Sequence, residues 1–300
     1  MVDSSSASMT AQSAQEPRPR GSFRMPAEPA AYRPVIVIPV YNHPATVEDV
    51  VRRLLSTGTP VLLVDDASDP PAQEACERCR AMGAGLVRRQ STGGRGASIL
   101  TGFKAARQAG FTHALVFDAG GRHDPAAVGS FLELSRKHSN DLVCGYARTS
   151  SAYPARARLA RRMADAGACL AALSLAPKDV MCRLRVYPLA AVSPLSACIG
   201  LGRRAEFEFE SLVRLMWMGL RLRELPVDPR PPADGVSHYQ PVRDTLRIAG
   251  MSAKLFIIML TRLPAVLISR STGWSPAPGL GSEHPQAHPS RSPSDDRSRT

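Results

Sequence analysis

Aromatic residues are scarce in this sequence, and its cysteines follow no recognisable pattern. Aromatic residues make up 5% of its 300 residues, and no nucleic-acid-binding module with aromatic stacking positions occurs, so we expect no nucleic-acid partner. The six cysteines show no framework spacing, which favours a reducing, cytoplasmic compartment. Cys76 and Cys79 form a single C-x-x-C pair within an expected helix, and without a second pair they make a poor zinc site.

Long hydrophobic runs are absent as well. No stretch reaches the roughly 18–20 apolar residues that a helix needs to cross a bilayer. The N-terminal residues include arginines but no apolar core of a signal peptide. We therefore expect neither a membrane-spanning segment nor a secretory leader.

Positive charge is abundant and is carried almost entirely by arginine. The chain has 38 Lys and Arg against 26 Asp and Glu, which gives a formal net charge of +12. Such an excess favours anionic partners, among them nucleotide phosphates and an anionic membrane surface.

Composition divides the chain into a folded part and two tails. Residues 1–30 and 271–300 can bury little apolar surface, so both are predicted to be disordered. Residues 31–240 are predicted to form the folded domain. Residues 241–270 are amphipathic and basic, and are predicted to form a helical segment that lies either on a membrane interface or against the domain.

Strands and helices are predicted to alternate along the first half of the chain. Apolar runs predict buried strands over residues 35–40, 61–64, 114–117 and 142–143. Helical patterns lie at residues 46–55, 72–82 and 97–109, the first opened by a capping box of Thr46 and Asp49. The less regular second half predicts helices over 156–175 and 206–218 and short strands over 183–186 and 222–225. This order predicts an α/β fold with a mostly parallel sheet that helices cover on both faces.

Polar residues follow the first three predicted strands where each of them ends. Tyr41 and Asn42 follow the first strand, Asp65 and Asp66 the second, and Asp118 the third. In sheets of this kind the ligand lies beyond the carboxyl ends of the strands. We therefore predict one shared ligand site at this edge.

Four segments, in this order, resemble family-2 glycosyltransferases of the GT-A fold: VIVIPVYNH, VLLVDDAS, GGRGASILTGFKAA and ALVFDAGGRHDP. Three later segments, DVMCRLRVYPL, GRRAEFEFESLVRL and DGVSHY, resemble a bacterial branch of polyprenyl-phosphate mannosyltransferase-like enzymes, some of which occur with lipid or aryl-polyene biosynthesis. The resemblance covers residues 33–262. It is the ordered set that carries it, since each segment alone is weak.

The resemblance implies an inverting transfer of a sugar from a nucleoside-diphosphate donor to a polyprenyl phosphate, another lipid or a different acceptor. It is compatible with a cytoplasmic protein that contacts the cytoplasmic face of a membrane peripherally. Asp65 and Asp66 would accept hydrogen bonds from base and ribose, and Gly93–Gly96 stands in place of the family's N-x-G-K-G loop, with Arg95 as its cation. The implied donor-binding residues are Pro39, Tyr41, Asn42, Asp65, Asp66, Arg95, Asp118, Ser237 and His238.

The resemblance also implies a D-x-D motif whose two acids hold Mg²⁺ or Mn²⁺ against the donor diphosphate. Asp118 keeps the first acid and is the implied metal ligand, but Gly120 replaces the second. Arg122 stands where relatives have Gln, and Arg183 where they usually have Gly. Asp124 is expected to cap the next helix rather than complete a metal site.

Three interpretations of this departure stay open. Arg122 takes over part of the metal's role, because a guanidinium clamps phosphate oxygens with two hydrogen bonds. Alternatively the site is degenerate, and the protein is an impaired homologue that binds nucleotide sugar or scaffolds a biosynthetic complex. In the third, Asp118, donor phosphates and water hold a metal together.

Acidic residues in the segment EFEFE are candidates for acceptor chemistry. Glu206 and Glu210 would share one face of a helix, and Glu208 would point elsewhere. One of these acids would act as general base for a hydroxyl acceptor, or they would only stabilise the start of a helix. An acceptor that is already a phosphate would need no strong base. The catalytic candidates are Asp118, Glu208, Glu210 and Arg122.

Overall fold

The computed structural model describes residues 31–148, 155–196, 200–230, 246–247 and 249–261. From Tyr32 onward these residues belong to one unit of the chain. The predicted tails, residues 1–30 and 271–300, lie outside the described residues, and so do Ser237 and His238.

Within the described part, seven strands form one sheet in the order β3-β2-β1-β4-β6-β5-β7. The strands are β1 (Pro34–Val40), β2 (Val61–Asp65), β3 (Gly85–Arg88), β4 (His113–Val116), β5 (Leu142–Ala147), β6 (Arg185–Pro188) and β7 (Leu222–Val227). Neighbouring strands are parallel except at β6, which is antiparallel to both β4 and β5. The predicted α/β fold with a mostly parallel sheet is confirmed.

The register of the central strands brings their carboxyl ends to the same edge of the sheet. Val40 at the end of β1 pairs with Asp65 at the end of β2. On the other side of β1, Val37 pairs with Val116, the last residue of β4. Asp118 therefore follows β4 at the edge where Asp65 and Asp66 follow β2.

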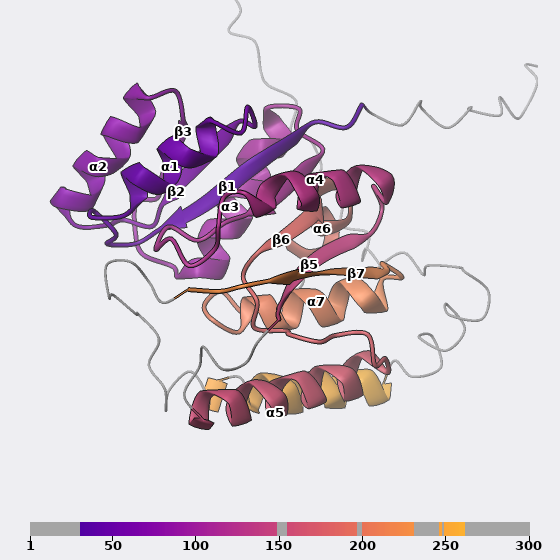
Figure 1. Ribbon diagram of the computed structural model, residues 1–300. Helices are drawn as coiled ribbons and strands as arrows, with labels where there is room; N and C mark the ends of the chain where they lie inside the picture. Colours follow the sequence, from indigo (N-terminus) through magenta and orange to yellow (C-terminus); the bar gives the residue numbers. More distant parts are fainter. Residues whose placement is uncertain (1–30, 149–154, 197–199, 231–245, 248, 262–300) are drawn as a thin grey trace, which may run out of the picture. The chain divides into compact units, whose positions relative to one another are not determined.

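Helices cover both faces of the sheet (Figure 1). They are α1 (Val47–Leu55), α2 (Pro70–Ala81), α3 (Arg95–Gln108), α4 (Ala127–Lys137), α5 (Ala155–Ala172), α6 (Leu189–Ser196) and α7 (Phe207–Trp217). A further helical stretch over residues 249–261 lies beside α5 (Figure 1). None of the helices in the described part is both long and apolar enough to cross a membrane.

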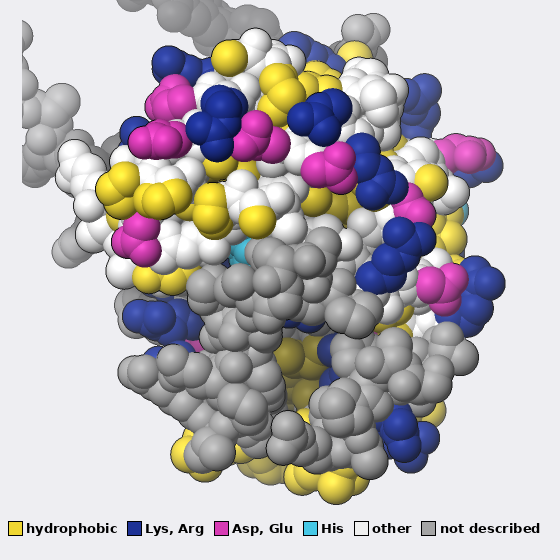
Figure 2. Space-filling model, turned by 60° about the vertical axis from the view of Figure 1, so that its left-hand side comes forward, with side chains coloured by type: hydrophobic (Ala, Val, Ile, Leu, Met, Phe, Trp, Pro, Cys, Tyr) yellow, Lys and Arg dark blue, Asp and Glu magenta, His cyan; other side chains and the backbone are white. Residues whose placement is uncertain are grey.

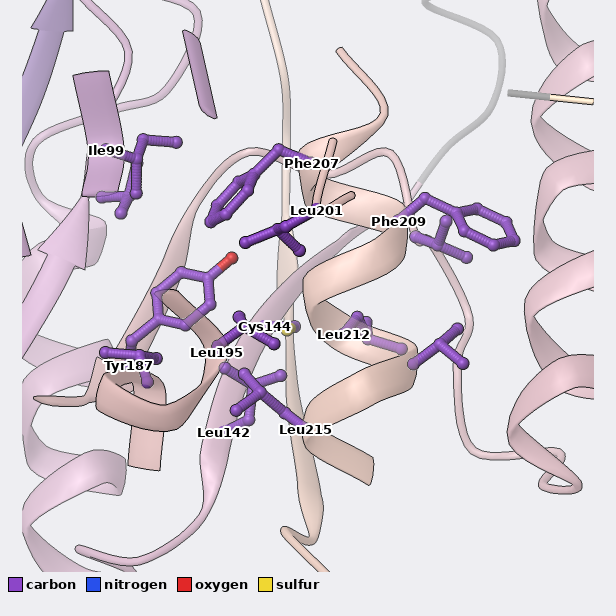
Figure 3. Close-up of a cluster of buried hydrophobic side chains, with 14 of the residues drawn as sticks. Ile99, Leu142, Cys144, Tyr187, Leu195, Leu201, Phe207, Phe209, Leu212 and Leu215 are labelled. Carbon is purple, nitrogen blue, oxygen red and sulfur yellow. The ribbon is translucent and has the colours of Figure 1, made fainter. Parts of the chain in front are cut away.

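Two hydrophobic cores lie on opposite faces of the sheet. Val35 and Val37 of β1 belong to one core, with side chains from α3, α5, α6 and α7. Ile36 and Ile38 belong to the other, with side chains from α1, α2 and α4. Side chains alternate between faces along a strand, so burial on both faces requires the uninterrupted apolar run that predicted this strand. Figure 3 shows part of the first core, where the apolar face of α7 packs against β5, β6, α3 and α6.

The structure corrects three local predictions. The hydroxyl of Thr46 donates to the carbonyl of Ala119 at 2.9 Å and makes no cap bond to α1, so the predicted capping box is wrong. The strand predicted over 183–186 lies two residues later, as β6. The short elements β3 and α6 were not predicted, and of α4 only its start, after Asp124, was expected.

Candidate active site

Asn42, in the loop after β1, forms hydrogen bonds with the loop after β2. Its backbone N–H donates to the hydroxyl of Ser68 at 3.1 Å, and its side-chain amide exchanges two hydrogen bonds with Asp69, both at 2.8 Å. Its φ of +55° lies in the left-handed region that Asn tolerates better than most residues. Asn42 therefore shapes the edge of the sheet. Nearby Tyr41 is partly exposed and Pro39 is buried in β1, and donor contacts of all three stay predictions.

The two aspartates after β2 are buried and hold different parts of this edge. Both oxygens of the Asp65 carboxylate are used inside the protein, one by the N–H of Ser68 at 3.0 Å and one by the guanidinium of Arg88 at 2.8 Å. Asp66 accepts the N–H groups of Gly93 and Gly94, at 3.1 and 2.7 Å. Asp66 thus organises the glycine-rich loop before α3, and contacts of the two aspartates with a base or ribose stay predictions.

The glycine-rich loop needs glycine for two separate reasons. Gly94 has a φ of +88°, and a Cβ there would come 3.0 Å from the carbonyl oxygen of Arg203. A Cβ on Gly96 would come 2.5 Å from the Cβ of Phe207. The missing side chains let the start of α3 approach the start of α7. This approach places Arg95, the first residue of α3, beside Glu208 of α7.

Three arginines converge on the carboxylate of Asp118. Its nearest guanidinium nitrogens belong to Arg183 at 3.4 Å, Arg95 at 3.5 Å and Arg122 at 3.6 Å. Arg95 also donates a short hydrogen bond from its Nε to the carboxylate of Glu208. The cluster formed by these five residues is called the arginine cluster below. It joins the loop after β4 to α3, to α7 and to the residues before β6.

The arginine cluster carries a surplus of positive charge in a buried place. Burial alone would raise the pKa of Asp118, but the charges of Arg183, Arg95 and Arg122 outweigh it and lower that pKa to about 2. Counted by formal charge, three arginines stand against two acids, Asp118 and Glu208, which leaves one positive charge. The Nη2 atom of Arg95 is buried without a hydrogen-bond partner among the described residues. A buried donor of this kind calls for an acceptor, and an anionic ligand would supply one.

The loop between Asp118 and Arg122 is fixed by its neighbours. Besides the bond from Thr46 to the carbonyl of Ala119, the N–H of Arg230 donates to the carbonyl of Arg122 at 2.8 Å. These two bonds fix the backbone of the loop that carries Asp118 and Arg122.

His123 lies under this loop and was not among the predicted site residues. Its ring is buried and packs edge-on against Phe117, and its Nδ1 has no hydrogen-bond partner among the described residues. Burial and the charges of the nearby arginines, opposed by Asp118, lower the pKa of His123 to about 4. The ring is therefore neutral at pH 7, and the arginines supply the positive charge of the site.

Comparison with known protein families identifies the family of this chain. The model described as glycosyl transferase family 2 matches residues 35–188, just over half of the chain. The chain belongs to glycosyl transferase family 2. No curated protein matches it, and the polyprenyl-phosphate branch stays a prediction.

Solved structures share the α/β fold of this glycosyltransferase. A structure described as that of a mycobacterial protein has a TM-score of 0.55 and 16% identity, over 80% of this chain and 75% of the other. This likeness shows the fold alone. S. aureus TarS 1-349 in complex with UDP-GlcNAc has a TM-score of 0.49 and 13% identity, over 74% of this chain and 66% of the other.

Mannosyltransferase PcManGT from Pyrobaculum calidifontis, in complex with GDP-Man and Mn²⁺, also has a TM-score of 0.49, with 12% identity over 81% of each chain. The TM-scores of TarS and PcManGT are both below 0.5. Neither likeness therefore says anything about the ligand or metal of this glycosyltransferase.

The residues of this glycosyltransferase do not fit a dedicated metal site. Gly120 supplies no second carboxylate, and three guanidinium groups surround the carboxylate of Asp118. In the part of the chain that the structure describes, no group of three or more His, Cys, Asp or Glu side chains is placed to hold an ion. Asp124 instead accepts the N–H of Ala126 at 3.1 Å, in the turn that leads into α4.

The structure separates the two glutamates predicted to be catalytic. Glu208 belongs to the arginine cluster through Arg95, and the buried guanidinium of Arg185 fixes the start of its helix by donating to the Glu208 carbonyl at 2.6 Å. Glu210 is fully buried and accepts from the N–H of Gly202 at 2.6 Å and from Arg214 at 2.7 Å. Those contacts give Glu210 a structural role, and a catalytic one stays a prediction.

Arg183 is a member of the site that the predicted residues did not include. The only signal for it in the sequence was an arginine where relatives usually have Gly. Ser237 and His238, predicted to contact the donor, lie outside the described residues. A cavity of about 650 Å³ lies elsewhere, along α3 and α6, and Asp118 does not line it.

Proposed function

We propose that this family-2 glycosyltransferase takes its sugar from a nucleoside-diphosphate donor and binds the donor diphosphate through Arg95, Arg122 and Arg183. The observation that supports this most strongly is the arginine cluster itself. It lies at the edge of the sheet where ligands of such folds bind, with one surplus positive charge and one buried, unpaired donor.

In the proposed reaction the arginines stabilise the leaving nucleoside diphosphate. Negative charge grows on the diphosphate as the bond to the sugar breaks, and fixed guanidinium groups stabilise it without having to reorganise. A guanidinium also matches two phosphate oxygens at once. Asp118 and Glu208 are positioning residues in this proposal, because they hold the arginines that contact the donor.

The proposed acceptor is a lipid-linked phosphate on the cytoplasmic side of the membrane. One of its oxygens would attack the anomeric carbon of the donor sugar with inversion, and the nucleoside diphosphate would leave. Such an acceptor is already anionic and needs no strong general base. This suits a site in which Asp118 and Glu208 both pair with arginines. A hydroxyl acceptor would instead require Glu208 to leave Arg95 before it accepted a proton.

Turnover of a panel of nucleotide sugars, measured with Mg²⁺, with Mn²⁺ and with EDTA, tests the proposal. We expect turnover in EDTA, and a loss of at least about tenfold in Arg122→Ala, because one charge-assisted contact to the diphosphate contributes about 1.5–3 kcal/mol. Arg80→Ala is the matched control, since Arg80 lies exposed on α2 and pairs only with Glu77 among the described residues. Turnover that requires a metal ion would contradict the proposal.

An impaired homologue is the second candidate, and Gly120 is the observation that favours it. In that case nucleotide sugars would bind without turnover, even with a lipid-phosphate acceptor present. Gly120→Asp would then restore metal binding, because it returns the missing second acid. Turnover by the natural chain in EDTA would exclude this candidate.

A further inference from the structure

Large exposed hydrophobic side chains gather on two helical segments of this protein. On α5, Leu159, Met163 and Leu170 are between 56% and 68% exposed, and on the stretch 249–261 Ile257 and Leu260 are 61% and 53% exposed. Leu175 and Leu246, close to these helices in sequence, are exposed as well. Isolated exposed apolar residues are ordinary, but a contiguous group marks an interaction site.

The two segments lie side by side and form an outer layer of the molecule (Figure 1). A Cβ on Gly167 of α5 would come 3.3 Å from the hydroxyl oxygen of Ser252, so the two helices are in close contact. Ala168 of α5 and Leu255 of the stretch 249–261 belong to the hydrophobic core beneath. The inward faces of both helices are therefore already used in folding.

The outward faces repeat with helical spacing and are apolar too. The exposed positions on α5 are Leu159, Arg162, Met163, Ala166 and Leu170. On the second helix they are Ala249, Gly250, Ala253, Phe256, Ile257, Leu260 and Thr261, none of them charged. A helix that is apolar on both faces is usually buried on both. Figure 2 shows hydrophobic side chains along the lower edge of the molecule, where this layer lies.

The charges beside these faces indicate what covers them. The described side chains of α5 and of residues 246–261 include five cations, Arg158, Arg161, Arg162, Arg247 and Lys254, and one acid, Asp165. Acids of neighbouring segments pair with two of the cations, Asp179 with Arg161 at 2.6 Å and Glu210 with Lys254 at 3.3 Å, so five cations stand against three acids. A second copy of the chain packed on this layer would bring like charges together, which is unfavourable. An anionic lipid surface would complement both the cations and the apolar faces.

We propose that α5 and residues 249–261 together form an interfacial surface that lies in the headgroup region of an anionic membrane. The apolar faces of both helices would enter the interface, and Arg158, Arg162 and Arg247 beside them would contact lipid headgroups. This proposal does not depend on glycosyl transfer, because its evidence lies outside the arginine cluster. A membrane-bound protein without transferase activity would satisfy it.

Co-sedimentation of the full chain with vesicles tests this surface. We expect binding to phosphatidylcholine vesicles that contain phosphatidylglycerol, weaker binding to phosphatidylcholine alone, and weakening by salt. Ile257→Glu and Met163→Glu should each reduce the partition coefficient by about tenfold or more, since each places a charge where an apolar side chain would enter the lipid. Both positions are exposed, so the variants should keep the far-ultraviolet spectrum and melting temperature of the natural chain.

Ser130→Glu is the matched control, because it adds the same charge at an exposed position of α4 and should bind vesicles like the natural chain. Two results would overturn the proposal. One is the absence of binding to either kind of vesicle. The other is a dimer, measured by light scattering, that Ile257→Glu dissociates, since this would assign the surface to a second copy.

Discussion

At the scale of single residues, the site is rich in arginine and poor in carboxylates. Gly120 stands where the resemblance implies a second acid, and arginines stand at positions 95, 122 and 183, where it implies Lys, Gln and usually Gly. Asp118 and Arg95 were predictable because each lies in a motif. His123 lies in the same motif as Asp118, but only the fold buries it, and the fold also brings Arg183 to the site from 65 residues away.

His123 gives the first prediction, which concerns stability and pH. Its pKa is about 4 in the folded protein and about 6.5 in the unfolded chain. The unfolded state therefore binds the proton first, so the contribution of His123 is complete above pH 6.5 and is lost as the pH falls toward 4. The loss is on the order of 3 kcal/mol in the free energy of unfolding.

Urea denaturation at several pH values measures this effect. His123→Asn should flatten the decline in unfolding free energy between pH 6.5 and 4. The contribution of Asp118 lies lower, because its folded pKa is about 2 and its stabilisation is lost only as the pH falls from about 4 toward 2. An equal decline in the natural chain and in His123→Asn would refute the assignment.

At the scale of helices and strands, prediction succeeded where an element is buried and its apolar residues form a clear run or period. The apolar runs of β1 and β2 and the helical pattern of α3 identified those elements correctly. The edge strand β3 has only four partly exposed residues, and α6 contains Pro194, so neither has a clear periodic pattern. Their structure depends on tertiary contacts, which local patterns do not carry.

The glycine-rich loop before α3 gives a prediction at this scale. Gly94→Ala should destabilise the protein by about 1–3 kcal/mol, because φ is +88° and the new Cβ would press on Arg203 and Arg204. It should also weaken nucleotide binding, since Arg95 follows directly. The measurements are thermal unfolding and a nucleotide titration.

Gly129→Ala provides the comparison for Gly94→Ala. Gly129 lies inside α4, and a Cβ there would meet nothing within 4 Å. Alanine should therefore stabilise this helix by about 0.5–1 kcal/mol. If both substitutions changed stability in the same direction and by the same amount, the special conformation of Gly94 would not explain its presence.

At the scale of the whole molecule, one fold serves two separate surfaces. The net charge is +12. On the face in Figure 2, Lys and Arg are interspersed with Asp and Glu, so this face does not carry a single basic patch. The proposed roles of the positive charge are local. Inside the molecule three arginines would bind a diphosphate. Beside the apolar layer of α5 and residues 249–261, Arg158, Arg162 and Arg247 would contact lipid headgroups.

Composition predicts anionic partners, which stay a prediction, and does not indicate where on the molecule they would bind. The amphipathic segment 241–270 was predicted either to lie on a membrane or to pack on the domain, and residues 249–261 do pack on the domain through Met251, Leu255 and Met259. The contribution of α5 to an exposed apolar layer was not predicted, because exposure depends on which face the core takes.

Donor binding by isothermal titration calorimetry, in EDTA and then with Mg²⁺ or Mn²⁺, tests most directly whether arginines have taken the place of a metal. We expect a nucleotide sugar or its nucleoside diphosphate to bind with the same Kd in EDTA as with metal, and Arg122→Ala to weaken binding in both conditions. Binding that appears only when metal is added, and that Arg122→Ala leaves unchanged, would contradict this assignment.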